Sequence, residues 1–469
     1  MDFLTQFLLV GGNVMSVLGF LAALVLLSRV RSRPAHPGTT LAWLLGLLFV
    51  PVVAIPLYLS FGGRRLVRRA ARKEKLGLQR PPLVENFSPS DPVQVALFSL
   101  KNAPPASGSN DIELLTNGEL VFERLVQCIR RARRTIHFAT FILNDDETGK
   151  ALIAELAAKA REGLEVRVLL DGMGSFWLPE KSFAPLREAG GEVSQFLPVL
   201  PFRRKWAANH RLHRKLYLFD GEEAIVGGHN LASEYLGPKP SERRWADAAF
   251  HLRGASVNAM ESVFLADWAF STGEEKEPPP PDTSVRPGYE VVQVVASGPD
   301  AESDSFHDVL LTAMTHAQKR LWIVTPYFVP DDTILRLLCL MARLGRDVRL
   351  LVPARSNHLL ADMARRAPIR ELLASGATVL LYKPRMLHSK VFVIDDSVAA
   401  VGSTNMDQRS FFLNFEVALF VYTPRSVNAV AEYVEELGRE CEAHVRRPIE
   451  RNVIVETAEN VAQLLSPLI

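Results

Sequence analysis

The sequence predicts an α/β protein whose two similar halves share one active site, preceded by two membrane-spanning helices. Three observations support this prediction. A 20-residue segment occurs twice at a constant offset of 175, segments of strand and helix character alternate around each copy, and two long uncharged stretches open the chain. With 469 residues, 48% of them hydrophobic, the chain is long enough for two or three cores.

The N-terminal residues 1–63 are predicted to form two transmembrane helices, at about 3–27 and 40–61. Charged residues are absent from 3–27 and from 37–63, and about 20 apolar residues in a helix suffice to cross the hydrocarbon layer. Three arginines lie between the stretches, and eight Lys or Arg follow from Arg64 to Arg80. By the positive-inside rule, the large domain is expected in the cytoplasm.

The rest of the chain is predicted to be a basic juxtamembrane and connecting segment (64–110), a first half (111–270), a linker (271–288) and a second half (289–469). Residues 135–143 and 164–171 are strand-like and flank a helical pattern at 149–162. The same order recurs at 320–332, 335–345 and 348–353. Four consecutive prolines and a run of charges indicate the linker.

The repeated segment reads RLHRKLYLFDGEEAIVGGHN at 211–230 and MLHSKVFVIDDSVAAVGSTN at 386–405, identical at 8 of 20 positions. His213 and Lys215 are two residues apart, so in a strand they face the same way, as do His388 and Lys390. Asp220 and Asp395 have the opposite parity, which predicts a structural role in the strand or turn. The glycines at 227 and 402 permit a close backbone approach.

Asn230 and Asn405 end the two copies, so His, Lys and Asn are expected to converge from each half. This set suits phosphoryl transfer, because Lys and Asn can donate hydrogen bonds to phosphate oxygens as charge grows in the transition state. One imidazole can attack phosphorus while the other protonates the leaving alkoxide. This chemistry requires no metal or other cofactor, and the sequence contains no metal-binding motif.

The two histidines need opposite protonation states, so each requires a neighbour that sets its tautomer or charge. Asp247 and Glu416 follow the two motifs in strand-like surroundings and are the candidate orienting carboxylates. Surface salt bridges are the alternative interpretation for both. Cys128, Cys339 and Cys441 show no disulfide or metal spacing and are expected to be reduced thiols.

The paired HxKxxxxD motifs, each followed by Gly and Asn, resemble those of the phospholipase D superfamily. Segments such as TPYFVPDD (325–332), EYLG (234–237) and STNMDQRSFFLNFE (403–416) resemble the bacterial cardiolipin synthase family over nearly the whole chain. This resemblance implies two phospholipase D-like halves, with Asp220 and Asp395 counted among the catalytic motif residues. It further implies a protein of the bacterial cell membrane that transfers a phosphatidyl group between two phosphatidylglycerol molecules and releases glycerol.

By analogy with two-motif relatives, His213 is expected to be the nucleophile and His388 the acid. Leu212 and Ala246 depart from the family pattern, which leaves the headgroup preference open.

Three alternatives to this transferase remain: a hydrolase that uses water as acceptor, a transferase that uses phosphatidylethanolamine, and an inactive scaffold. Intact motifs in both halves argue against a scaffold. A net charge of +2 and two predicted membrane spans argue against nucleic acid as a partner. The resemblance implies phosphatidylglycerol as the substrate, and the basic juxtamembrane cluster suits an anionic lipid surface. The sequence does not separate transfer from hydrolysis, and it leaves the oligomeric state open.

Overall fold

The protein is described from a computed structural model that covers most of its length. The described residues are 14, 16–24, 37–55, 89, 91–100, 103–198, 210–276, 287–299, 304–445, 457–459 and 462–463. The chain divides into a small unit, Met1–Leu66 with Ala207–Asn209, and a large unit that contains both repeated motifs.

The described part of the small unit is helical at 16–24, in α2 (Pro37–Phe49) and at 51–55. Ala23, Leu47 and Ala54 pack together in its interior. Among the described residues, no helix has both the length and the apolar character needed to span a membrane. The predicted spans at 3–27 and 40–61 extend beyond the described ranges, and the basic cluster at 64–80 lies outside them, so both stay predictions.

The large unit is built on one sheet of 15 strands in which the two halves meet. The strand order is β17-β12-β11-β9-β13-β14-β16-β8-β1-β7-β6-β5-β2-β3-β4. From the central antiparallel pair β8 and β1, the order reads outward in the same way on both sides, with β16, β14, β13, β9, β11 and β12 matching β7, β6, β5, β2, β3 and β4. This topology makes the duplication predicted from the sequence visible in the fold.

The first half begins with a strand and ends with a long helix. Its elements are β1 (Ser107–Leu115), α6 (Gly118–Arg131), β2 (Thr135–Thr140), α7 (Glu147–Arg161), β3 (Glu165–Asp171), η1 (Glu180–Phe183), α8 (Ala184–Glu188), β4 (Glu192–Phe196), β5 (Leu216–Phe219), β6 (Glu223–Gly227), β7 (Ala249–Gly254) and α9 (Ser256–Thr272). Asn117 and Asp146 cap α6 and α7 by accepting hydrogen bonds from backbone N–H groups of the first turn.

The second half repeats this order with small additions. Its elements are β8 (Glu290–Ser297), α10 (Ser305–His316), β9 (Arg320–Val324), β10 (Phe328–Val329), α11 (Asp332–Arg343), β11 (Asp347–Pro353), α12 (Leu359–Ala364), α13 (Arg366–Ala374), β12 (Thr378–Tyr382), β13 (Val391–Ile394), β14 (Val398–Gly402), β15 (Met406–Asp407), α14 (Gln408–Phe412), β16 (Glu416–Val421), α15 (Pro424–Arg439) and β17 (Cys441–Ala443).

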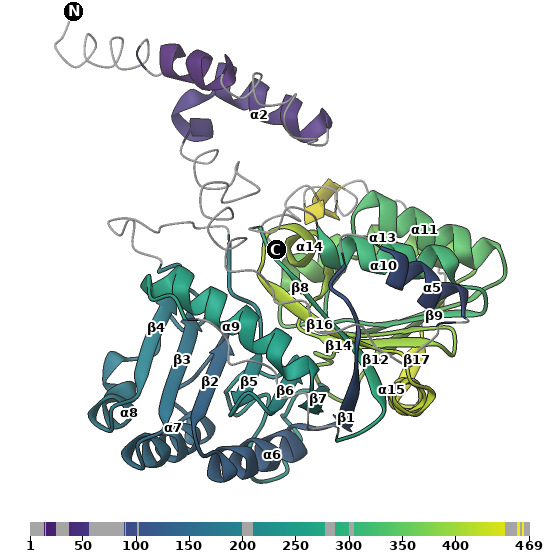
Figure 1. Ribbon diagram of the computed structural model, residues 1–469. Helices are drawn as coiled ribbons and strands as arrows, with labels where there is room; N and C mark the ends of the chain where they lie inside the picture. Colours follow the sequence, from purple (N-terminus) through teal and green to yellow (C-terminus); the bar gives the residue numbers. More distant parts are fainter. Residues whose placement is uncertain are drawn as a thin grey trace, which may run out of the picture. The chain divides into compact units, whose positions relative to one another are not determined.

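Helices cover both faces of the sheet in each half. Figure 1 shows α9 along one face of the first half and α6, α7 and α8 along the other, with α15 and the group α10, α11 and α13 in the corresponding places of the second half. Each half has its own hydrophobic core between sheet and helices. The predicted α/β class and its strand-helix-strand order are confirmed.

The segment predicted to connect the membrane region to the first half contains a helix that belongs to the second. In α5 (Pro92–Ser99), Val93 and Leu97 are buried in the core of the second half. The Gln94 side-chain amide donates hydrogen bonds of 2.8 and 3.1 Å to the backbone carbonyls of Ser397 and Tyr422. Sequence alone gave no sign of this packing. The proline-rich part of the predicted linker, 277–286, lies outside the described residues.

Candidate active site

Each histidine motif lies immediately before a strand and pairs with the other half. His213 and Lys215 precede β5, and His388 and Lys390 precede β13. The backbone N–H of His213 donates to the carbonyl of Phe415, and that of His388 donates to the carbonyl of Ala246. These crossed contacts extend the two parallel bridges between the halves, Leu212 with Phe415 and Ala246 with Leu387.

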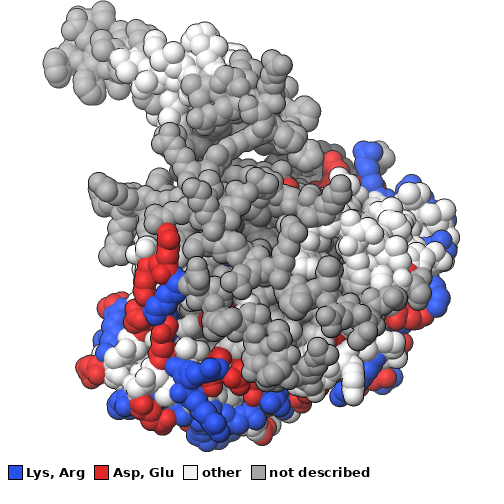
Figure 2. All heavy atoms as spheres, in the orientation of Figure 1, with Lys and Arg blue, Asp and Glu red and all other residues white. Residues whose placement is uncertain are grey.

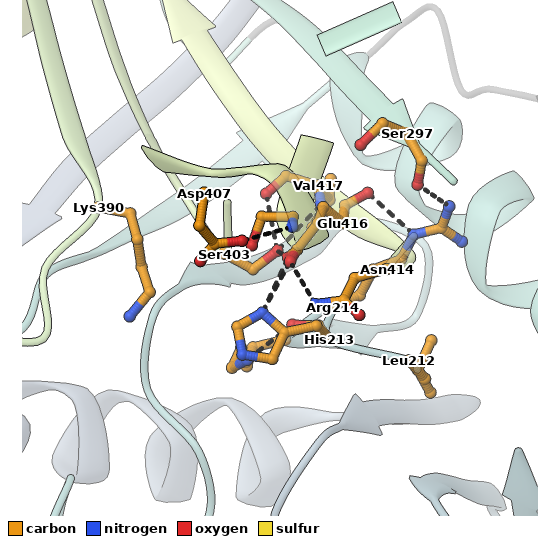
Figure 3. Close-up of polar contacts among 12 residues, drawn as sticks. Leu212, His213, Arg214, Ser297, Lys390, Ser403, Asp407, Asn414, Glu416 and Val417 are labelled. Atoms are coloured by element: carbon orange, nitrogen blue, oxygen red, sulfur yellow. Dashed lines mark hydrogen bonds and ion pairs between the residues drawn. The ribbon is translucent and has the colours of Figure 1, made fainter. Parts of the chain in front are cut away.

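His213, from the first half, contacts a carboxylate from the second. Its Nδ1 lies 2.9 and 3.0 Å from the two carboxylate oxygens of Glu416. The carboxylate also accepts hydrogen bonds from the Ser403 hydroxyl and the Asn414 side-chain amide. Figure 3 shows the Glu416 carboxylate between these groups and the His213 ring. Glu416 therefore fixes the ring and favours a proton on Nδ1, which leaves the Nε2 lone pair free.

His388, from the second half, contacts the corresponding carboxylate of the first. Its Nδ1 lies 2.7 Å from Asp247 Oδ2, while Asp247 Oδ1 accepts a hydrogen bond from the backbone N–H of Ala248. No added side chain fits beside this carboxylate, because a Cβ on Gly228 would lie 2.3 Å from Asp247 Oδ1. The position that corresponds to Gly228 in the second half is Ser403, whose hydroxyl binds Glu416.

The two motif lysines are buried and lie beside the histidines of their own motifs. Lys215 Nζ donates a 2.7 Å hydrogen bond to the His213 carbonyl, and Lys390 Nζ makes the corresponding contact to the His388 carbonyl. Lys390 Nζ also lies 3.0 Å from His388 Nε2. Burial lowers the pKa of Lys215 to about 7 and that of Lys390 to about 8, although nearby carboxylates oppose the change.

Burial also favours the neutral forms of both histidines. It lowers the pKa of His213 to about 4 and that of His388 to about 3, and the motif lysines act in the same direction. Asp247 and Glu416 oppose this effect. The pKa values of Asp247 and Glu416 themselves are lowered because cationic and imidazole groups nearby outweigh the cost of burial. Without substrate, the site therefore contains two carboxylates and two neutral imidazoles near pH 7.

The motif aspartates lie at turns and bind backbone groups. Asp220 accepts hydrogen bonds from the N–H groups of Arg133, Arg134 and Thr135 at the start of β2. Asp395 accepts the equivalent hydrogen bonds at the start of β9. Both have positive φ, 55° and 50°. Their contacts are those of the structural role that strand parity predicts, and they give no support to a direct part in the chemistry.

The two motif asparagines, Asn230 and Asn405, are buried. Asn230 Oδ1 accepts a 3.2 Å hydrogen bond from the backbone N–H of Ile142, and its side chain hydrogen-bonds Tyr235. Asn405 hydrogen-bonds the Asp407 carboxyl, while its Oδ1 has no hydrogen-bond partner among the described residues. Phosphate binding by either amide remains a prediction.

Aromatic side chains that the sequence analysis did not assign to the site surround the histidines. The Phe141 ring packs edge-on against His213 at 5.2 Å and lies 5.6 Å from Lys215 Nζ. Tyr235 and Trp245 pack against His388 at 5.0 and 5.3 Å. Phe141 directly follows β2, whose C-terminal end lies beside the motif residues that precede β5. This position in the sequence could have indicated a place in the site. Tyr235 lies in the EYLG segment, whose one signal in the sequence is its resemblance to the family.

One group of potential metal ligands occurs among the described residues, and it lies apart from the histidine pairs. Cys128, Glu223 and His251 place ligand atoms within 4.8 Å of one another. Glu223 already pairs with Arg131 at 2.9 Å, and Arg124 lies 2.7 Å from His251 Nδ1. Burial and the Glu223 carboxylate raise the pKa of the Cys128 thiol to about 12. The predicted free cysteines are confirmed at all three positions.

Comparison with known proteins identifies the family. The model of the cardiolipin synthase PLD-like domain matches residues 125–268 and 310–438, and a phospholipase D-nuclease N-terminal model matches 17–63. Cardiolipin synthases of Halalkalibacterium halodurans and Alkalihalophilus pseudofirmus are each 36% identical, over 92% of this chain and 90% of theirs. A phosphatidylserine synthase structure from Haemophilus influenzae shares the fold, with a TM-score of 0.60, 17% identity and coverage of 85% of this chain and 98% of that one. The chain belongs to the cardiolipin synthase family of phospholipase D-like proteins.

Proposed function

We propose that the chain is a phosphatidyltransferase that makes cardiolipin from two phosphatidylglycerol molecules and releases glycerol. The family relationship supports the activity, since curated cardiolipin synthases match nearly the whole chain. The observation that carries the mechanism is the pair of histidines, each bound at Nδ1 by a carboxylate from the opposite half. This arrangement leaves His213 Nε2 available to attack phosphorus, while His388 Nε2, 3.0 Å from Lys390 Nζ, is assigned the proton transfer.

In the proposed first step, His213 Nε2 attacks the phosphorus of one phosphatidylglycerol. The bond from nitrogen to phosphorus forms as the bond from phosphorus to the glycerol oxygen breaks, and protonated His388 gives its proton to that oxygen. Glycerol leaves, and a phosphatidyl group remains on His213. Because His388 is neutral without substrate, the anionic phosphodiester must raise its pKa when it binds.

In the second step, a free glycerol hydroxyl of another phosphatidylglycerol gives its proton to His388. The hydroxyl oxygen attacks phosphorus, the bond to His213 breaks, and cardiolipin forms. Lys215 and Lys390 are positioned to stabilise the charge on the non-bridging oxygens during both steps. We assign the same role to the side-chain amides of Asn230 and Asn405. No step needs a metal or an organic cofactor.

Burial supports transfer over hydrolysis. The side chains of His213 and His388 are 12% and 5% exposed, and aromatic rings pack against both. A site with little room for solvent favours a lipid hydroxyl over roughly 55 M water, because the acceptor is positioned and water is excluded. Hydrolysis by water and use of phosphatidylethanolamine as a substrate remain the alternative outcomes.

The surface charge and the N-terminus fit a lipid enzyme. Figure 2 shows one face of the molecule, and on its described part basic and acidic side chains are interspersed. A protein that binds nucleic acid typically has a broad basic surface instead. Val17, Phe20 and Leu21 are exposed in the N-terminal helical segment, which supports contact with lipid. We propose that the predicted spans anchor the enzyme in the bacterial cell membrane as a multi-pass protein with the catalytic unit in the cytoplasm.

Labelled phosphatidylglycerol tests the proposal. The full chain is incubated with this lipid in liposomes, without added metal, and the products are separated. Cardiolipin with an equal amount of glycerol, lost in His213→Ala and in His388→Ala, is the expected result. Phosphatidic acid in place of cardiolipin would instead establish a hydrolase.

A further inference from the structure

Two exposed apolar segments occupy corresponding positions in the two halves. The first apolar loop, residues 172–178, follows β3, and the second, residues 354–360, follows β11 and runs into α12, whose first two residues are Leu359 and Leu360. Trp177 is 89% exposed, and Met173 and Phe176 beside it are also exposed. Leu359 is 73% exposed, and Leu360 is exposed next to it. Clusters of neighbouring exposed apolar side chains commonly mark an interaction site.

The first apolar loop is attached to residues that contact the nucleophilic histidine. The Ser175 hydroxyl donates to the Phe141 carbonyl and accepts from the backbone N–H of Leu143. Phe141 packs against His213. At the base of the loop, Asp171 Oδ1 accepts from the N–H groups of Met173 and Gly174, while its Oδ2 accepts from the N–H of Leu212. The loop is thus held against the segment that carries His213.

The second apolar loop is attached in a similar way. The Tyr327 hydroxyl donates a 2.6 Å hydrogen bond to Asn357 Oδ1, and the Tyr327 ring lies 6.3 Å from that of His358. Tyr327 follows β9, as Ile142 follows β2, and Thr325 and Thr140 make equivalent hydrogen bonds there. Each loop is therefore bound to the chain segment that leaves the neighbouring strand of its own half.

Within each half, strand directions place the apolar loop at the strand ends where the motif histidine of that half lies. β3 is parallel to β2, and β11 is parallel to β9. β5 and β13 run antiparallel to β2 and β9, so the motifs that precede β5 and β13 lie at the ends where β2 and β9 finish. Each loop therefore leaves its strand beside the motif of its own half, and the bridges of Leu212 with Phe415 and of Ala246 with Leu387 bring the two motifs together.

We propose that the two apolar loops insert into the surface of the lipid bilayer and hold the active site against it. The inference rests on the proposed function, because a phosphatidyl donor and acceptor reside in a bilayer. Trp and Phe are favoured at the boundary between headgroups and acyl chains. Covering exposed leucine side chains with acyl chains lowers the free energy of the bound state. One loop on each half lets the donor and acceptor lipids enter a site that both halves form.

Quenching of tryptophan fluorescence by brominated lipid tests this proposal on the full chain. The protein is reconstituted in nanodiscs of phosphatidylglycerol and phosphatidylcholine with brominated or ordinary acyl chains. We expect bromine to quench the emission of Trp177, so Trp177→Phe should lower the quenched fraction of the total emission. Trp322→Phe, which removes a buried tryptophan of the same unit, is the matched control and should not lower that fraction.

A reporter at the second loop completes the test. Leu359→Trp in the Trp177→Phe background places an indole at an exposed position and should restore the quenched fraction. An unchanged quenched fraction in Trp177→Phe, or no gain from Leu359→Trp, would overturn the inference, whatever the activity of the sample. Cardiolipin formation measured in the same nanodiscs tests the proposed function separately.

Discussion

His213 and Glu416 are 203 residues apart in the chain, yet His213 Nδ1 lies 2.9 and 3.0 Å from the two carboxylate oxygens of Glu416. His388 and Asp247 repeat this relationship in the opposite direction at 2.7 Å. Each half therefore contains one motif histidine and the carboxylate that orients the motif histidine of the other half. Neither half contains a complete site.

Replacement of an orienting carboxylate by an amide is expected to lower kcat sharply with little loss of fold. Glu416→Gln should reduce cardiolipin formation by about 10³-fold, because an amide neither holds the proton on Nδ1 nor stabilises a cationic imidazole. Asp247→Asn should act similarly through His388. Initial rates on labelled phosphatidylglycerol give the measurement.

Glu436→Gln, at an exposed position of α15, is the matched control for these two variants and should keep wild-type activity. Rates within about threefold of wild type in both Glu416→Gln and Asp247→Asn would remove the proposed role of the carboxylates.

A methyl group at Gly228 is expected to disturb the pair of Asp247 and His388. The added Cβ would lie 2.3 and 2.4 Å from the Asp247 carboxylate oxygens, too close for either group to stay in place. Gly228→Ala should therefore lower activity by at least about tenfold. Gly438→Ala is the control, since its Cβ would meet the Leu380 side chain at 3.9 Å and alanine favours a helix. Equal activities in the two variants would show that this close packing does not matter to catalysis.

The pKa values of the motif lysines predict the pH dependence of substrate capture. Burial lowers them to about 7 for Lys215 and about 8 for Lys390, and a lysine is neutral above its pKa. In the free enzyme, kcat/KM should therefore fall as pH rises through 7 to 8, because the cations that receive the phosphodiester are lost. Rates at subsaturating phosphatidylglycerol between pH 6 and 9 test this. A steady rise in kcat/KM across that interval would contradict it.

The burial of Lys215 is also expected to lower the free energy of unfolding. The pKa of Lys215 falls from 10.5 to about 7 on folding, so between these values the folded state binds fewer protons than the unfolded state, and this group makes stability rise with pH. Lys215→Met removes the cost. It should raise the free energy of unfolding by about 1 kcal/mol at pH 7, and the gain should shrink toward pH 10.

Thermal unfolding in detergent at several pH values measures the gain from Lys215→Met, and the variant should be inactive. Lys181→Met, at an exposed position, is the control and should show no gain that depends on pH. Destabilisation by Lys215→Met at every pH would show that the lysine contributes more through its carboxylate neighbours than burial costs.

The sequence predicted the fold where the signal is local or repeated. The strands and helices around 135–171 and 320–353 follow from alternating and helical patterns, and the duplication follows from the constant offset between His213 and His388. Asp247 and Glu416 were found as candidates, but their crossed pairing was not, because it depends on how β7 and β16 meet the opposite half. The packing of α5 on the second half has the same long-range origin.

Some residues near the site cannot be recognised from the pattern of a single sequence. Phe141 reads as the end of a strand, and its contact with His213 appears when β2 and the segment before β5 lie side by side. Trp177, in a loop, and Leu359, at the start of α12, have no distinguishing pattern in the sequence, and the fold shows that they are exposed at equivalent places. Asp220 and Asp395 show the opposite case, since a structural role in the strand or turn was predicted and both bind backbone N–H groups at turns, although the motif histidines and lysines precede β5 and β13 instead of lying in them.

Trapping of the covalent intermediate identifies the nucleophile of the two-half site. His388→Ala is mixed with a phosphatidyl ester of p-nitrophenol, whose leaving group needs no acid, and the reaction is quenched and digested for mass spectrometry. We expect a burst of about one nitrophenolate per site and a phosphatidyl adduct on His213, absent in His213→Ala. A burst without this adduct, or an adduct on another residue, would contradict the assignment of His213 as the nucleophile of a site built from both halves.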